Sequence, residues 1–139
     1  MDRFSKDYAL LLKIRSIRAE KAERKMAEAD ARRDASLAKL QAADHMAATA
    51  QAHVAEASLN RRRLTSRQVS GAELQQLRSA EVIARARMED RAFDVLRARA
   101  EVEQRTSEAE VSRALFAKAH RMVIKTETII DELKTGEVS

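Results

Sequence analysis

Three histidines are the side chains in this sequence best suited to binding a metal ion or moving a proton near neutral pH. They are His45, His53 and His120, and no two of them are three or four residues apart, the spacing that places two ligands on one face of a helix. Asp44 lies beside His45, but neighbouring charges are expected in a chain in which 35% of the residues are charged. We interpret the histidines as solvent-facing or interface-flanking side chains and expect no metal site.

Other common catalytic patterns are missing from the sequence as well. It has no cysteine, which excludes a disulfide framework and a thiolate metal site. Its two glycines, Gly71 and Gly136, stand alone rather than in a phosphate-binding loop. Serine, histidine and aspartate all occur, but two long helices offer no pocket that would exclude water from a reaction. We therefore expect a protein that is not an enzyme and needs no cofactor.

Charge could instead support binding. Three consecutive arginines, Arg61, Arg62 and Arg63, are followed closely by Arg67. They could be solvated side chains beside a loop that have no function, or they could contact an acidic protein surface or phosphate. No aromatic residue is interleaved with them to stack on a base, so we expect no nucleic-acid partner. The net charge of +5 comes from 27 basic and 22 acidic residues, which is a mixed surface with a modest basic excess.

Apolar side chains gather toward both ends of the chain. Three of its four aromatic residues lie there, and together with nearby aliphatic residues they cover a wider arc than a two-stranded coiled coil buries. This arc could thicken the end of the fold, bind a partner, or do both. The residues are Phe4, Tyr8, Leu10, Leu11, Leu12, Ile14 and Ile17, with Leu115, Phe116, Met122, Val123, Ile129 and Ile130.

The composition indicates which elements hold these side chains. The chain of 139 residues contains no proline, two glycines and 3% aromatic residues, which is typical of long helices and excludes all-β and α/β folds. The longest apolar run, residues 8–12, is far shorter than the roughly 20 residues that span a bilayer. We expect no transmembrane segment and no signal peptide, and a cytoplasmic location.

A 3.5-residue repeat runs through the second half of the sequence. Apolar residues occupy most of the positions spaced alternately three and four apart, and the register holds over 60 residues. Such a repeat specifies a coiled-coil interface. The positions are Leu74, Leu77, Glu81, Ala84, Met88, Arg91, Val95, Ala98, Val102, Arg105, Ala109, Ser112, Phe116, Ala119, Val123, Thr126, Ile130 and Leu133.

The first half carries a matching repeat in which alanine dominates. Alanine lets a partner helix come close but buries little area in each layer. The positions are Ala22, Met26, Ala29, Arg33, Ser36, Leu40, Ala43, Ala47, Ala50, Val54, Ala57, Arg61 and Leu64.

Between the two repeats lies a segment with Ser, Thr and Gly71 in which the pattern lapses. Ser70 and Glu73 have the spacing of a capping box, Gly136 suits a helix C′ stop, and Asp2 suits an N-cap. We predict one domain over 1–139, an all-α antiparallel coiled-coil hairpin that is a monomer on its own. Its helices span about 3–65 and about 71–135, joined by a loop at about 66–70, and each is roughly 90 Å long.

Folding about this loop pairs residues whose numbers add to roughly 136. That register predicts that Arg105 lies near Asp30 and Asp34. It also predicts that Arg33 lies near Glu101 and Glu103. A charge at an interface position lowers stability but can fix the register.

One local motif carries a family resemblance. The run from Leu11 to Glu23 reads LLKIRSIRAEKAE and, with the chain length, the mid-chain loop and the heptad second helix, resembles the YscO/FliJ family of type III secretion stalk proteins. The resemblance is an overall pattern over nearly the whole chain. It does not separate the injectisome from the flagellar system.

The resemblance implies a non-catalytic cytoplasmic rod at the base of the secretion apparatus, peripheral to the membrane through its partners. It implies that the paired termini engage the hexameric export ATPase, either as a rotating stalk or as a static adaptor, and that the loop end contacts the export gate or substrate chaperones. Carried over, the residues at the ATPase end are Phe4, Tyr8, Leu11, Ile14, Phe116, Val123 and Ile130. Those at the loop end are Arg61, Arg62, Arg63, Leu64 and Leu74.

Two other functions remain open from the sequence. One is a generic coiled-coil spacer or chaperone that oligomerises through its interface. The other, suggested by the sequence pI of about 9.9 and the arginine triplet, is a basic nucleic-acid-associated coiled coil.

Overall fold

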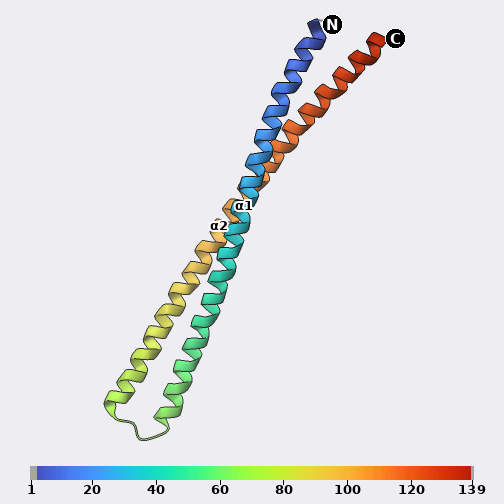
Figure 1. Cartoon of the computed structure of the whole chain (residues 1–139). Helices are drawn as coiled ribbons and strands as arrows, with labels where there is room; N and C mark the ends of the chain where they lie inside the picture. Colours follow the sequence, from blue (N-terminus) through green and yellow to red (C-terminus); the bar gives the residue numbers. More distant parts are fainter. Residues whose placement is uncertain (1–2, 139) are drawn as a thin grey trace. The chain divides into compact units, whose positions relative to one another are not determined.

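The computed structural model describes residues 3–138, with side chains described through residue 136. Two helices account for nearly all of them: α1, Arg3–Thr65, and α2, Gly71–Val138 (Figure 1). The described residues contain no strand. The two helices run antiparallel and pack against each other, so the prediction of an all-α helical hairpin is confirmed.

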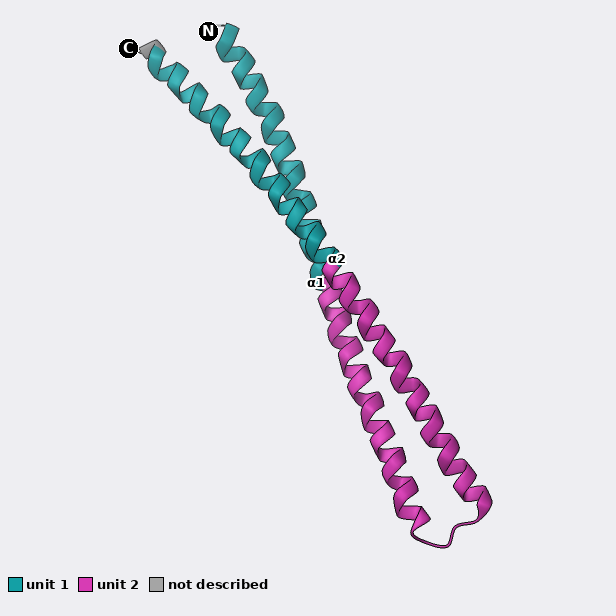
Figure 2. Cartoon of the chain, turned by 180° about the vertical axis from the view of Figure 1, so that it is seen from behind, with its two compact units in different colours: residues 1–34, 104–139 teal, residues 35–103 magenta. Residues whose placement is uncertain are grey.

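The structure divides into two compact units (Figure 2). Unit 1 comprises residues 1–34 and 104–139, and therefore both termini; unit 2 comprises residues 35–103 and the loop. In each unit a segment of α1 lies beside a segment of α2. Within unit 1 the two segments diverge toward the termini in both views. That the chain is a single domain stays a prediction.

The 3.5-residue repeat in α2 marks the face that meets α1. All of its eighteen predicted positions except Leu133 are buried or half-buried. Val95, Ala109, Val123 and Thr126 are among the buried ones. The hydrophobic spacing alone was enough to find this face, because a helix can bury only one stripe against a single partner.

The repeat in α1 marks the opposite face, and it is built from small residues. All of its thirteen predicted positions except Leu64 are buried or half-buried. The residues buried on this side are Ala19, Ala29, Ser36 and Ala50. Because these side chains are small, each layer removes little apolar area from water and contributes little stability.

The start of α2 is capped as its sequence predicts. The amide of Glu73 donates to the hydroxyl of Ser70 at 3.2 Å, and the amide of Leu74 donates to the Ser70 carbonyl at 3.1 Å. The Ser70 hydroxyl therefore satisfies one of the amides that the first turn leaves without a helical partner, and the Ser70 carbonyl accepts the first hydrogen bond of the helix. Asp2, the predicted N-cap of α1, lies outside the described residues.

The predicted stop at Gly136 is wrong, because α2 continues to Val138. A C′ glycine ends a helix by taking a positive φ, and neither glycine of the chain does so. A glycine inside a helix costs only about 1 kcal/mol relative to alanine, and no proline follows to end the helix. The glycine therefore remains helical.

The charged partners across the interface also differ from those predicted. Asp30 pairs with Arg113 at 3.2 Å rather than with Arg105, and Glu101 pairs with Lys39 at 3.5 Å. Arg105 pairs within its own helix. The numbers in these two of the cross-helix pairs add to 143 and 140 rather than 136. Side chains lean toward the N-terminus of their own helix. In an antiparallel pair, two long side chains that meet therefore belong to residues whose numbers add to more than the backbone register predicts.

Candidate partner-binding surfaces

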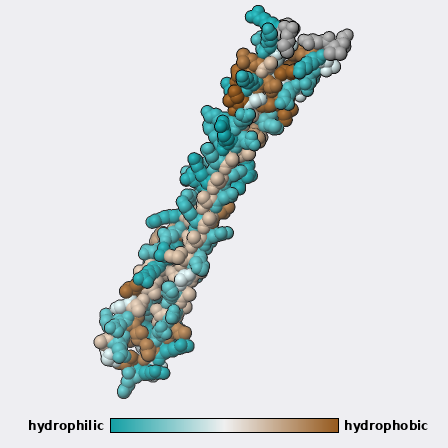
Figure 3. Space-filling view, in the orientation of Figure 1, coloured by the Kyte–Doolittle hydropathy of each residue, from teal (hydrophilic) through white to brown (hydrophobic). Residues whose placement is uncertain are grey.

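The terminal part of unit 1 exposes large apolar side chains on both helices. Figure 3 shows hydrophobic residues gathered at this end of the visible face. Phe4 is the most exposed of them, at 66%. We call this set the terminal apolar surface; it comprises Phe4, Leu10, Ile14, Ile17, Leu115, Met122, Ile124 and Leu133.

The seven residues predicted for the ATPase end lie at different depths in unit 1. Phe4 and Ile14 are exposed and belong to the terminal apolar surface. Val123 is buried between the helices, so its side chain supports the surface and does not face outward. The remaining four, which are Tyr8, Leu11, Phe116 and Ile130, are half-buried.

A hydrogen bond joins the two helices beneath this surface. The guanidinium of Arg15 donates to the hydroxyl of Thr126 at 2.6 Å, and that hydroxyl donates to the carbonyl of Met122 at 2.8 Å. The Thr126 side chain is fully buried. The sequence placed Thr126 at the interface but gave no sign of its partner, because Arg15 precedes the α1 repeat.

Beside this hydrogen bond, a groove of about 310 Å³ runs between α1 and α2. Apolar side chains from both helices form part of it, and three cationic side chains line it without any carboxylate. Such a groove suits an apolar side chain that has acidic neighbours. The groove is lined by Leu11, Arg15, Arg18, Leu115, Lys118, Ala119 and Met122.

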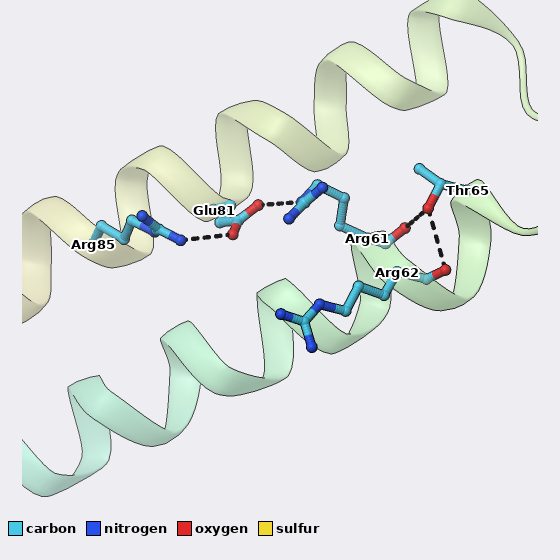
Figure 4. A network of polar contacts seen from close by, with 5 residues as sticks. All are labelled: Arg61, Arg62, Thr65, Glu81 and Arg85. Atoms are coloured by element: carbon cyan, nitrogen blue, oxygen red, sulfur yellow. Dashed lines mark hydrogen bonds and ion pairs between the residues drawn. The ribbon is translucent and has the colours of Figure 1, made fainter.

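In unit 2, a buried carboxylate joins the helices near the loop. Glu81 accepts a hydrogen bond from Arg61 at 2.5 Å and another from Arg85 at 3.1 Å (Figure 4). The hydrogen bond from Arg61 lowers the pKa of Glu81 below its ordinary value of 4.5, and the charges of both arginines lower it further. Both Arg61 and Glu81 are predicted interface positions, so the two breaks in the apolar pattern were the signal for this pair.

The residues predicted for the loop end also differ in their surroundings. Arg62, Arg63 and Leu64 are exposed, whereas Leu74 is half-buried. Arg61 is half-buried and held by Glu81. Of the five, Arg62, Arg63 and Leu64 therefore present their side chains to solvent.

A second groove, of about 490 Å³, lies between the helices of unit 2. Three of its nine lining residues are alanines, whose small side chains leave space at the edge of the interface, and we call it the alanine groove. Its lining residues are Met46, Thr49, Ala50, His53, Ala80, Ile83, Ala84, Arg87 and Arg91.

The histidines do not come together. His53 lines the alanine groove, and His120 stacks on Phe116 with ring centroids 5.7 Å apart. Within the described part of the chain, no three His, Asp or Glu side chains are placed to hold a metal ion. Over the same residues, neither helix has a stretch long and apolar enough to cross a membrane.

No protein-family model, curated protein or solved structure matches the chain. Its function is therefore argued from the terminal apolar surface and the loop end themselves.

Proposed function

We propose that the chain is a non-catalytic adaptor of a type III secretion apparatus, located in the cytoplasm at the base of that apparatus. Its terminal end engages the hexameric export ATPase, and its loop end contacts the export gate or substrate chaperones. The terminal apolar surface is the observation that carries the proposal. The Leu11–Glu23 run, which resembles the YscO/FliJ family, lies in the same unit and supplies part of that surface.

Exposing large apolar side chains to water costs free energy. A contiguous patch of large apolar side chains on a protein surface marks an interaction site. Phe4, Leu10 and Ile17 lie more than half exposed on α1, and Leu115 does so on α2. A partner that covers residues from both helices gains their hydrophobic free energy.

The position of this surface fits a ring-shaped partner. Both helix ends contribute to it, so a channel that admits the helix pair would contact apolar residues of both helices. The groove lined by Arg15, Arg18 and Lys118 adds positive charge beside the apolar residues, which favours a partner with acidic side chains around an apolar patch.

A non-catalytic role is part of the proposal. The grooves described above lie along the outside of a helix pair, whereas catalytic groups work best in sites closed to water.

A spacer that self-associates is the second candidate, and the alanine groove of unit 2 favours it. A helix from another copy could cover Met46 and Ile83, which are exposed beside the groove alanines. Under the adaptor proposal the isolated chain is a monomer. Light scattering over a concentration series distinguishes the two, since a mass that rises with concentration supports the spacer.

The chain offers a matched pair of variants to test the adaptor. Phe4 and Phe93 are exposed to similar extents, 66% and 61%, but Phe4 is in unit 1 and Phe93 is in unit 2. We expect the purified chain to stimulate hydrolysis by the export ATPase of the same organism, with saturation. Phe4→Ala should raise the concentration that gives half-maximal stimulation about tenfold, the size of an interface hot spot, and Phe93→Ala should leave it unchanged.

Helicity measured by circular dichroism controls for folding in both variants. A folded chain that leaves hydrolysis unchanged at every ratio would overturn the proposal. Equal losses from both variants would place the contact elsewhere than at the terminal end.

A further inference from the structure

The loop end of unit 2 holds the net charge of the whole molecule. Residues 59–88 contain seven arginines and two glutamates, with no lysine, aspartate or histidine. This segment therefore carries a net charge of +5, equal to that of the chain. The remaining residues balance to zero, so a polyanion would be attracted to this end of unit 2.

Part of this charge is neutralised within the fold. Glu81 is bonded to both Arg61 and Arg85, and Glu73 lies in the first turn of α2, where a negative charge is favourable. The other arginines of the segment have no such partner. All five of them are exposed, and we call the four nearest the loop in the sequence, which are Arg62, Arg63, Arg67 and Arg78, the loop-end arginine surface; the fifth is Arg87.

These four arginines have no side-chain hydrogen bond or ion pair among the residues that the structure describes. Figure 4 shows the guanidinium of Arg62 apart from the bonded group around Glu81. Free guanidinium groups retain all their donors for an outside ligand.

The end of α1 does not need these side chains for capping. Cationic residues often bond the last carbonyls of a helix, but here hydroxyl groups do so. Thr65 donates to the carbonyls of Arg61 and Arg62 at 2.8 and 3.2 Å, and Ser66 donates to that of Arg63 at 2.7 Å. The helix dipole favours Arg62 and Arg63 in the last turn, but it gives no reason for Arg78 in the second turn of α2.

Exposed aliphatic side chains lie in the same segment as these arginines. Leu59, Leu64 and Val82 are 45%, 37% and 66% exposed. Residues 59–88 contain no aromatic side chain that could stack on a nucleic-acid base. Cationic side chains beside aliphatic ones suit the boundary between lipid headgroups and acyl chains, where the charge meets phosphate and the aliphatic group enters the apolar layer.

We propose that the loop-end arginine surface binds anionic phospholipid headgroups, with Leu59 and Leu64 entering the edge of the acyl layer. The contact is peripheral and direct. It does not depend on the adaptor proposal, since vesicle binding needs no protein partner and the ATPase contact uses unit 1, so either proposal can fail alone.

The test is co-sedimentation of the full chain with vesicles of phosphatidylcholine alone and of phosphatidylcholine with about one third phosphatidylglycerol. We expect binding to the anionic vesicles at about 0.1 M salt and loss of binding at about 0.5 M, where the screening length is shorter. The triple variant Arg62→Gln, Arg63→Gln, Arg67→Gln should lower the partition coefficient by on the order of 100-fold.

A matched triple variant separates location from overall charge. Arg97→Gln, Arg99→Gln, Arg121→Gln also removes three exposed arginines, so both variants have the same net charge. We expect this control to bind the anionic vesicles within about threefold of the unchanged chain. A second variant, Leu64→Ser, should weaken binding to the anionic vesicles severalfold at about 0.1 M salt, because it removes the aliphatic contribution without changing the charge.

Three results would overturn the proposal. The first is a folded chain that does not sediment with anionic vesicles at about 0.1 M salt. The second is an equal loss in the two triple variants, which would reduce the effect to net charge. The third is tighter binding to a short DNA duplex, by anisotropy in the same buffer, lost in the Arg62, Arg63, Arg67 variant; this would assign the surface to nucleic-acid phosphates.

Discussion

Units 1 and 2 are built from the same two helices, but their interfaces and surfaces differ in chemistry. In unit 1 the neutral hydroxyl of Thr126 accepts a hydrogen bond from an arginine at the interface, and the unit exposes large apolar side chains nearby. In unit 2 the carboxylate of Glu81 accepts hydrogen bonds from two arginines, and the exposed residues near the loop include unpaired arginines beside smaller aliphatic side chains. One heptad pattern can therefore carry an apolar end and a charged end, because the interface uses only one face of each helix.

The largest expected effect comes from placing a charge inside one interface. In unit 1, Val123 is buried and the adjacent Ile124 is 48% exposed. Val123→Asp buries a carboxylate without a partner and should destabilise the helix pair by about 3 kcal/mol or more. Ile124→Asp should change stability by less than about 0.5 kcal/mol. Thermal unfolding followed by circular dichroism measures both; similar losses would mean that the interface faces have been assigned wrongly.

A smaller effect should follow from removing the hydroxyl that joins the helices of unit 1. Thr126→Val keeps the shape of the side chain but removes the acceptor of the Arg15 hydrogen bond. We expect a loss of about 1 kcal/mol, typical of one hydrogen bond.

Thr128→Val is the control for this change. Thr128 is exposed and also donates its hydroxyl to the carbonyl four residues before it, at 2.9 Å. The two variants therefore lose the same local bond, and only Thr126→Val loses the bond to α1. Equal stability of the two in urea unfolding would show that the Arg15 contact contributes nothing.

The smallest effect should be an acid sensitivity of unit 2. The hydrogen bond from Arg61, together with the charges of Arg61 and Arg85, lowers the pKa of Glu81 below 4.5. The charged carboxylate therefore stabilises the fold above pH 4.5, and this contribution is lost as the pH falls through the lowered pKa. Glu81→Gln removes the titrating group. The unchanged chain should therefore lose more stability than Glu81→Gln between about pH 6 and pH 3.

Glu103→Gln serves as the control, since Glu103 is exposed in the same unit. It should follow the pH dependence of the unchanged chain. If Glu81→Gln also follows it, the two arginines do not favour the charged form of Glu81 in solution.

The helices and the faces on which they meet could be predicted from the sequence, because both follow from local spacing. Their bounds at Arg3, Thr65 and Gly71 agree with prediction to the residue. The prediction that α2 ends at Gly136 was wrong because a single glycine destabilises a long helix only slightly.

Polar partners across the interface could not be predicted in the same way. They depend on how far each long side chain leans along its helix. Pairing residues by sequence number alone does not take that lean into account. Arg15 with Thr126 and Asp30 with Arg113 both show the shift.

The small residues of the α1 interface have a thermodynamic consequence. The heat capacity change of unfolding rises with the apolar area that unfolding exposes. An interface built on Ala19, Ala29, Ser36 and Ala50 hides little such area. Per residue, the heat capacity change of unfolding should therefore be smaller than the roughly 12–15 cal/mol/K that is usual for globular domains. The free energy of unfolding should then curve little with temperature, so that cooling removes little of the stability of this molecule.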